Sequence, residues 1–337
     1  MNPLLRVLWF GLLALPASGR AWDRGRVEEF AVLPEGASGP EGPETGPDGN
    51  VYVTTFGFTS SGPASGEGQL YVFNGRGRLL RQVSVASSTP HLLGLRFHPN
   101  GALLVIDFGG QQVLQVNPHT GASQVFMTVP AGPMAGLNDL TFDKAGNVYV
   151  SDSFRGAVWK TGPSGGAGAQ WVQDSLLVPN GVPPFGANGL RFDEGEKNLF
   201  VANTSNDTIV RVPVDSDGGA GVPTVFTNSV SGADGLLVDA EGNLWVCANQ
   251  ADEIVVIDKS GKAIAKLGDF DGVRAGLPSH LLFPASLRFH GDDLLVTNLS
   301  LNSHLFGFTT VDTDWSAQVS RYTVARIRLR DRRSDDD

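Results

Sequence analysis

Lys144-Ala145-Gly146-Asn147-Val148-Tyr149-Val150 places a polar turn with a glycine directly before an apolar run of residue types that favour β-strands. The same pattern returns in five further segments, at 47–53, 99–105, 195–201, 240–246 and 290–296. Each segment predicts a β-hairpin, because turn residues that tolerate positive φ stand beside β-prone runs. Successive copies lie 45 to 52 residues apart, so the chain contains six repeats of about fifty residues.

A third apolar run follows most copies, as at 208–212 and 253–257, and a fourth follows in several repeats. Four short strands per repeat, without long helical periodicity, are typical of a β-propeller blade. The sequence therefore predicts an all-β, six-bladed β-propeller with four antiparallel strands per blade. We expect an N-terminal strand at 27–33 and a C-terminal strand at 319–327 to pair in one blade and close the ring.

The first 19 residues have the pattern of a secretory signal peptide, in which Arg6 precedes an apolar run at 7–15 and small residues follow. This run is too short to cross a bilayer, which takes roughly 20 apolar residues. We expect residues 20–329 to form a single propeller domain and residues 330–337 to form a disordered acidic tail. The protein is therefore expected to be secreted or periplasmic, with no membrane contact after cleavage.

The net charge of −10, with only 25 basic residues, argues against nucleic acid as a partner and suits the attraction of cations. The 43 glycines and 20 prolines are spread along the whole chain, as expected for many turns between short strands. The single cysteine, Cys247, excludes an internal disulfide. Its strand-like surroundings predict a small buried apolar residue.

One position recurs at the start of the innermost strand of every repeat, at successive spacings of 52, 45, 50, 46 and 51 residues. The six equivalent residues are Glu41, Leu93, Asn138, Asn188, Asp234 and Ala285. Innermost strands of a propeller all run the same way along the central channel, so these residues should form a ring around one mouth. The alternative interpretation is that these residues only form turns, because Asn-Gly, Asn-Asp and Asp-Gly are common turn dipeptides.

Four of the six ring residues carry side-chain oxygens, and bringing them together is costly unless something compensates their charges and dipoles. Calcium takes roughly 6 to 8 oxygen ligands and tolerates irregular geometry, so it fits this set. The absence of His and Cys from the ring argues against zinc. We therefore expect a Ca²⁺ site, although another divalent cation also suits the residues.

Four short motifs on these repeats resemble the regucalcin/gluconolactonase (senescence marker protein-like) family, namely Glu41-Gly42-Pro43, Asn138-Asp139, Asn188-Gly189 and Asp234-Gly235. Paraoxonases and diisopropylfluorophosphatase are more distantly similar. The resemblance implies a calcium-dependent hydrolase, most often of lactones and sometimes of phosphotriesters. It implies that Glu41, Asn188 and Asp234 hold the metal, and that Asn138 binds metal or substrate.

Two residues are candidates for the catalytic base. Asp234 would either activate a water or attack the substrate directly, and the sequence leaves both routes open. His91, two residues before Leu93, resembles a Pro-His pair of paraoxonases, and imidazole is a common general base in enzymes. It is either an alternative base or a histidine at the rim without a chemical role.

The substrate site is expected to be more apolar than a sugar needs, because Leu93 and Ala285 occupy ring positions where some relatives have polar residues. Phe185, in a loop rich in Phe and Pro, adds to this character, although such residues also pack between blades. The predicted function is a secreted calcium-dependent hydrolase that acts on a small-molecule lactone or related ester at the channel mouth. A non-catalytic binding propeller and a propeller lyase or synthase are the alternatives.

Overall fold

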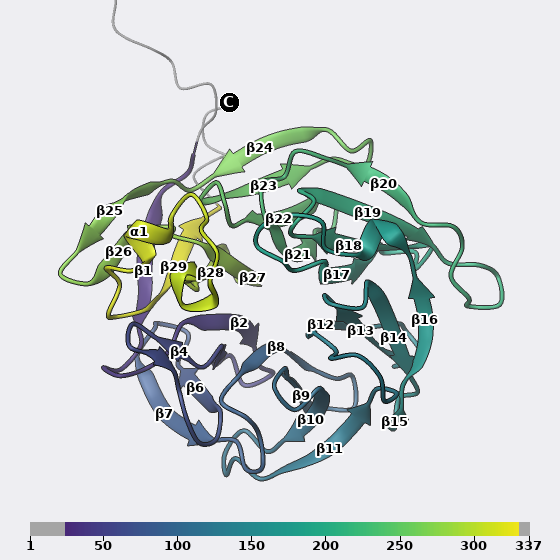
Figure 1. The fold of residues 1–337 in the computed structure, drawn as a ribbon, viewed down its shortest axis with the longest axis horizontal. Coiled ribbons are helices and arrows are strands. Elements are labelled where there is room, and N and C mark those ends of the chain that lie inside the picture. Colours follow the sequence, from purple (N-terminus) through teal and green to yellow (C-terminus); the bar gives the residue numbers. More distant parts are fainter. Residues whose placement is uncertain (1–23, 330–337) are drawn as a thin grey trace, which may run out of the picture.

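The structure is a computed structural model that describes residues 24–329, and its strands form a ring of six small sheets around a central channel (Figure 1). This confirms the predicted all-β, six-bladed propeller. The predicted signal peptide at 1–19 and tail at 330–337 lie outside the described residues. In the described part of the chain, no helix has the length and apolar character to cross a membrane.

Each blade extends outward from an innermost strand beside the channel to an outermost strand at the rim. Blade 1 contains, in that order, β2 (Pro40–Thr45), β3 (Val51–Thr55), β6 (Gln69–Phe73) and β7 (Leu79–Ser84). Blade 2 contains β8 (Leu92–Phe97), β9 (Leu103–Asp107), β10 (Gln112–Val116) and β11 (Ser123–Thr128). Blade 3 contains β12 (Leu137–Phe142), β13 (Val148–Asp152), β14 (Ala157–Thr161) and β16 (Ala169–Gln173).

The second half of the ring continues in the same way. Blade 4 contains β17 (Ala187–Phe192), β18 (Asn198–Asn203), β19 (Thr208–Pro213) and β20 (Thr224–Thr227). Blade 5 contains β21 (Ala233–Val238), β22 (Leu244–Ala248), β23 (Glu253–Ile257) and β24 (Ala263–Leu267). Blade 6 contains β27 (Pro284–His290), β28 (Asp293–Asn298), β29 (Thr323–Arg328) and β1 (Val27–Val32).

The ring closes in blade 6, where the N-terminal strand β1 pairs antiparallel with the C-terminal strand β29. The register runs from Val27 opposite Ile327 to Val32 opposite Thr323, so the predicted closure is confirmed. The C-terminal strand begins four residues later than the sequence predicted, at Thr323 rather than at 319. Blade 6 is thus assembled from both ends of the domain.

The connections add short elements to the four-stranded pattern. Blade 2 gains a fifth strand, β15 (Gly166–Ala167), which pairs parallel with β11 although it belongs to the chain of blade 3. The remaining elements are the hairpins β4 (Phe58–Thr59)/β5 (Gly62–Pro63) and β25 (Phe270–Arg274)/β26 (Leu277–His280), the 3₁₀ helices η1 (Ser175–Leu177) and η2 (Ser303–Phe306), and α1 (Thr313–Ser316). The last two lie in a long insertion, 299–322, between β28 and β29.

The repeated hairpin pattern explains how neighbouring blades pack at every second blade interface. In three copies an aromatic residue on the second strand meets a phenylalanine on the next blade's inner strand, with ring centroids 4.9–5.4 Å apart. The pairs are Tyr52–Phe97, Tyr149–Phe192 and Trp245–Phe289. The polar atom of each Tyr or Trp donates a hydrogen bond to an aspartate in its own turn, so the ring packs between blades without an unsatisfied donor.

Every innermost strand carries a β-bulge at the same place. The register with the second strand shifts between the first and the fourth residue of all six inner strands. The predicted ring residue is the second residue in each case, so it lies inside the strand rather than before it. A bulge leaves its residues outside the regular ladder and re-aims their side chains, which here allows them to face the channel mouth.

Neighbouring inner strands come very close at the residue after the ring position. A Cβ at Gly189 would lie 2.4 Å from the carbonyl oxygen of Asp234, and one at Gly235 would lie 2.6 Å from the Cα of Ser286. Asn188-Gly189 lies within strand β17 and Asp234-Gly235 lies within strand β21, so neither pair is a turn dipeptide. Glycine is needed here for close approach between blades.

Gly189→Ala should lower the free energy of unfolding by about 1–3 kcal/mol, because the added methyl group would force two backbones apart. Gly162→Ala is a matched control, since a Cβ there meets nothing within 4 Å. It should be neutral or slightly stabilising, because alanine restricts the unfolded chain. Urea denaturation followed by tryptophan fluorescence measures both, and equal losses in the two variants would contradict the close-approach argument.

Candidate active site

The ring position gathers its four oxygen-bearing side chains around one cavity at the channel mouth. Glu41, Asn138, Asn188 and Asp234 all line it, and each is at most 5% exposed. The cavity volume is about 30 Å³, enough for an ion or a water but not for a whole lactone. The other lining residues are Phe56, Leu93, Pro183, Phe185, Thr204, Asn249, Phe283, Leu299 and Leu301.

Two of these buried oxygens lack a partner. Asn138 Oδ1 and Asp234 Oδ1 are shielded from solvent, and no hydrogen bond from the described residues reaches either atom. A buried polar atom without a partner is rare, because it has lost its hydration and gained nothing in return. The two atoms mark the cavity as a place where a ligand completes the structure.

The two carboxyl groups of the cavity both have raised pKa values. Burial raises the pKa of Glu41 well above its usual range, and the nearby carboxylates of Asp234 and Asp139 raise it further. Burial also raises the pKa of Asp234 to about 8, although hydrogen bonds from Asn249 and Asn188 act in the opposite direction. Both shifts have the same main cause, which is the burial of the carboxylate away from solvent.

A divalent cation fits this donor set. Two carboxylates and two carboxamides offer only oxygen, the ligand type that calcium prefers, and two of the oxygens are unpartnered. Among residues 24–329 no three His, Cys, Asp or Glu side chains cluster as a metal site. The carboxamides of Asn138 and Asn188 are therefore essential to the candidate site, because Glu41 and Asp234 alone supply only two charged ligands.

A second ring of equivalent residues, which the sequence analysis missed, lies directly after the second strand of each blade. In every blade the backbone N–H at this position donates to the carbonyl two residues before the first-ring residue, at 2.8–3.3 Å. The members are Phe56, Phe108, Ser153, Thr204, Asn249 and Leu299. A signal was present, because each one stands three residues after the final valine of its hairpin copy.

The polar members of the second ring orient the first. Asn188 Nδ2 donates to Thr204 Oγ1 at 2.9 Å, and Asn138 Nδ2 lies 3.5 Å from Ser153 Oγ. With its amide nitrogen turned toward a hydroxyl, the carboxamide of Asn138 leaves Oδ1 as its unpartnered oxygen. Asn249 Nδ2 donates to Asp234 Oδ2 at 2.8 Å, which leaves Asp234 Oδ1 free.

The same hydroxyls tie adjacent blades together. Ser153 Oγ donates to the carbonyl of Ala187 in blade 4, and Thr204 Oγ1 donates to the carbonyl of Ala233 in blade 5, both at 2.7 Å. Each accepting residue directly precedes a first-ring residue. The oxygen-bearing side chains are thus held in place by bonds that cross the blade interfaces.

The two rings divide the mouth into unlike halves. Blades 3, 4 and 5 place Asn138, Asn188 and Asp234 beside the polar second-ring residues. Blades 6, 1 and 2 place Leu299, Phe56 and Phe108 at the same level of the second ring. Apart from Glu41, the first-ring side chains of this half are the apolar Leu93 and Ala285.

The remaining predicted site residues lie at different distances from the cavity. Leu93 and Phe185 line it, whereas Ala285 is fully buried in the adjoining apolar cluster and does not. His91 does not line it either. Its Nδ1 lies 2.7 Å from the carbonyl oxygen of Phe56, and its ring stacks on Phe58 with centroids 4.9 Å apart.

A tier of charged residues lies deeper in the channel, three residues after the ring position. Three arginines occupy this level in alternate blades, at Arg96, Arg191 and Arg288. Arg191 pairs with Asp139 at 2.7 Å, and Arg288 pairs with Glu44 at 2.8 Å. The carboxylate of Asp139, although next to Asn138 in sequence, is therefore held by an arginine.

The fold and the site define a six-bladed propeller with a buried, oxygen-lined pocket at one mouth of its channel. Residues 82–268 match the family described as SMP-30/Gluconolactonase/LRE-like region. The chain belongs to this family, which confirms the resemblance seen in the sequence.

Known relatives show how far the likeness extends. Lactonase drp35 of Staphylococcus haemolyticus is 29% identical over 137 residues, which are 39% of this chain and 41% of that protein. The match thus spans less than half the length of this relative. Lactonase drp35 of Staphylococcus aureus strain MRSA252 matches to the same extent.

Two solved structures share the fold at low identity. A gluconolactonase from Xanthomonas campestris superposes with a TM-score of 0.63 at 15% identity, covering 90% of this chain and 89% of that one. Regucalcin from Agrobacterium tumefaciens, described as a calcium-binding protein, gives a TM-score of 0.62 at 16% identity, covering 88% and 94%. These likenesses establish the common architecture.

The raised pKa of Asp234 predicts how the metal-free protein responds to pH. The unfolded chain releases this proton near pH 4, whereas the folded chain keeps it up to about pH 8. The folded state therefore holds the extra proton between these values, and stability falls as the pH rises through this window. Asp234→Asn removes the titrating group while keeping an oxygen for Asn249.

With excess chelator, Asp234→Asn should melt at a higher temperature than the parent at pH 8, and the difference should shrink at pH 5. Thermal unfolding followed by circular dichroism measures this. Asp217→Asn, at an exposed turn, is the control and should leave the parent's pH response unchanged. A gap of the same size at both pH values would contradict the proposed burial of charge.

Proposed function

We propose that this protein is a calcium-dependent hydrolase that acts on a lactone or related ester at the mouth of the propeller channel. The observation that carries the proposal is the set of four buried oxygen-bearing side chains around one cavity, two of them with unpartnered oxygens. Membership of a family that includes lactonases supports the reaction class. Secretion is proposed as well, on the sequence of residues 1–19 alone.

Glu41, Asn138, Asn188 and Asp234 would hold the cation. When bound there, the cation supplies a Lewis acid that polarises the substrate carbonyl and stabilises the developing oxyanion. The chain's own contribution is orientation, since Thr204 and Asn249 fix the side chains of Asn188 and Asp234. The dry walls at Leu93 and Phe56 exclude water from the other side of the cavity.

Asp234 is the group placed to handle the proton of an attacking water. Its Oδ2 accepts a hydrogen bond from Asn249, so Oδ1, the oxygen that would also contact the cation, is the one left to accept a proton from a water in the cavity. The same atom then returns the proton to the leaving alkoxide. His91 is less suited to this role, because one ring nitrogen is engaged with the Phe56 carbonyl and the residue does not line the cavity.

Asp234→Asn should lower kcat for a reactive lactone by about 10²–10⁴-fold at saturating calcium, the usual contribution of a general base. Calcium affinity should fall much less, because the carboxamide still offers an oxygen. Glu41→Gln is the matched variant, since it removes the same charge from another blade and should weaken calcium binding more than turnover. His91→Gln should stay close to the parent.

Steady-state kinetics on a panel of lactones and aryl esters, together with calorimetric calcium titration, measure these effects. Full turnover by Asp234→Asn combined with loss in His91→Gln would assign the base to His91 instead. If the purified protein holds no calcium, and chelation alters neither activity nor melting temperature, the metal assignment is wrong. If no panel member is hydrolysed, a non-catalytic binding propeller becomes the better description.

A further inference from the structure

Seven phenylalanines form a continuous arc around the mouth of the channel, which we call the phenylalanine arc. Its members come from blades 4, 3, 2, 1 and 6 in turn, and they are Phe185, Phe154, Phe108, Phe56, Phe58, Phe306 and Phe308. Each ring contacts the next, with centroids 4.3–6.1 Å apart along the whole arc. Blade 5, which carries Asn249, contributes no member.

The arc leads from the cavity to the surface. Phe56 and Phe185 line the cavity, where they lie beside Leu93 and Leu301. Phe56 and Phe108 are buried, whereas the other five members are half-buried and so present part of each ring to solvent. The arc is therefore an apolar path that begins beside the four oxygen-bearing side chains and ends outside.

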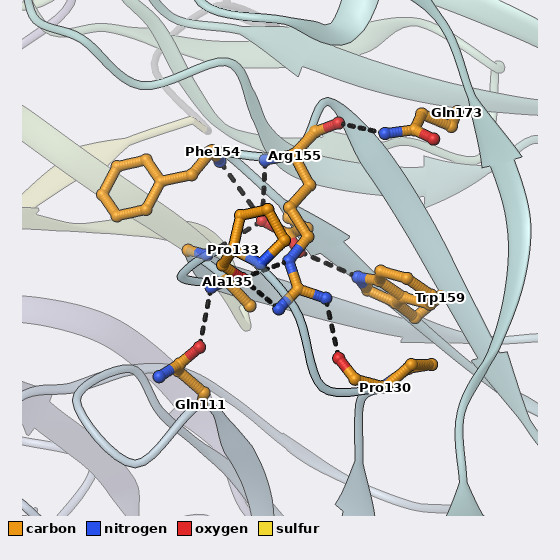
Figure 2. Close-up of polar contacts among 10 residues, drawn as sticks. Gln111, Pro130, Pro133, Ala135, Phe154, Arg155, Trp159 and Gln173 are labelled. Atoms are coloured by element: carbon orange, nitrogen blue, oxygen red, sulfur yellow. Dashed lines mark hydrogen bonds and ion pairs between the residues drawn. The ribbon is translucent and has the colours of Figure 1, made fainter.

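The loop that carries Phe154 is held by polar contacts. Figure 2 shows the side chain of Arg155 reaching the carbonyls of Pro130 and Pro133, while the ring of Phe154 points away from these polar contacts. The loop of Pro133 is also held by Gln111 of blade 2, whose Oε1 accepts from Ala135 N at 2.7 Å. Rings held in this way present a preformed surface, which reduces the entropy lost on binding.

The chemistry of the arc selects between substrate classes. A sugar lactone carries a hydroxyl group on most of its carbons, and each one loses hydration on burial unless a polar partner replaces it. The seven phenylalanine side chains offer no nitrogen or oxygen. The polar side chains of the cavity, in blades 3 to 5 together with Glu41, are needed to bind one ester group and its cation.

The size of the cavity also favours a substrate with an apolar substituent over a sugar lactone. At about 30 Å³ it has room for the reacting carbonyl but not for the rest of a substrate. The remainder is then expected to lie along the half-buried rings of Phe58, Phe306 and Phe308, which offer apolar surface. An alkyl or aryl substituent gains from this contact, whereas a hydroxylated chain does not.

From these contacts we infer that the substrate is a lactone or ester with a large alkyl or aryl substituent, which binds along the phenylalanine arc, and is not a sugar lactone. This inference rests on the proposed function and narrows its substrate class. Phe306 is the specificity-determining residue of the arc, because its ring meets three other members, Phe56, Phe58 and Phe308. It lies in the blade 6 insertion.

The test is a series of δ-lactones with unbranched alkyl substituents of zero to seven carbons, together with gluconolactone. For the parent protein at saturating calcium, kcat/KM should rise roughly threefold to fourfold for each added CH₂ that the arc covers. Gluconolactone should be among the poorest substrates. A flat series, or a preference for gluconolactone, would overturn the inference while leaving the hydrolase proposal in place.

Phe306→Ala should flatten this dependence, with the largest loss for the longest substituent and little change for the unsubstituted lactone. Phe226→Ala is the matched control, because that half-buried ring packs on Phe200 in blade 4, outside the arc. It should keep the parent's slope. Equal losses for all lactones in Phe306→Ala would indicate a structural role only and would contradict the inference.

A binding measurement separates this inference from the proposed function. If no lactone is hydrolysed, calorimetric titration with the heptyl-substituted lactone still reports on the arc. Binding by the parent that Phe306→Ala weakens at least tenfold would support the arc while the hydrolase proposal fails. Absence of binding to the parent would overturn the inference about the arc as well.

Discussion

The close approach of six innermost strands around one axis is the constraint on which the rest of the molecule depends. Each strand begins with a bulge, and the next residue is so near the neighbouring blade that glycine stands there in four of six blades. This packing determines the path of the backbone independently of the side chains that face the channel mouth. The first-ring residues therefore face a common point because of the fold, and their chemistry can differ from blade to blade without moving the backbone.

The asymmetry of the mouth arises from such differences on a symmetric frame. Where a second-ring residue is Ser153, Thr204 or Asn249, it holds the polar side chain of its own blade. Where it is Phe56, Phe108 or Leu299, it extends an apolar wall instead. One half of the mouth thus has the groups that suit a cation and an ester, and the other half has the groups that suit hydrocarbon.

The features that follow the repeat were predictable from the sequence. The six blades and the equivalence of Glu41, Asn138, Asn188 and Asp234 follow from the spacing of the repeats, and the closure follows from the strand-like segments at both ends of the domain. The second ring could also have been predicted, since its residues follow the same repeat. Its role in orienting the first ring is seen only in the hydrogen bonds of the structure. The turn interpretation of Asn188-Gly189 is wrong, because the pair lies within strand β17. Its glycine is required by the closeness of the neighbouring strand, which the sequence does not show.

The arginine tier and the phenylalanine arc could not be predicted in the same way. The pairing of Arg191 with Asp139 joins residues in different blades, and no local pattern specifies it. Phe306 and Phe308 stand in an insertion that has no counterpart in the other repeats. His91 shows the reverse case, because its motif suggested chemistry whereas its contacts place it beside Phe58, away from the cavity.

Closure of the ring by β1 and β29 sets the order in which a newly made chain can mature. Until β29 is in place, β1 and β28 each lack the neighbour that lies between them, and two strand edges stay open. The insertion at 299–322, which carries two members of the arc, has only one anchored end at that stage. Open strand edges pair with other chains, so the chain stays exposed to aggregation for as long as blade 6 is incomplete.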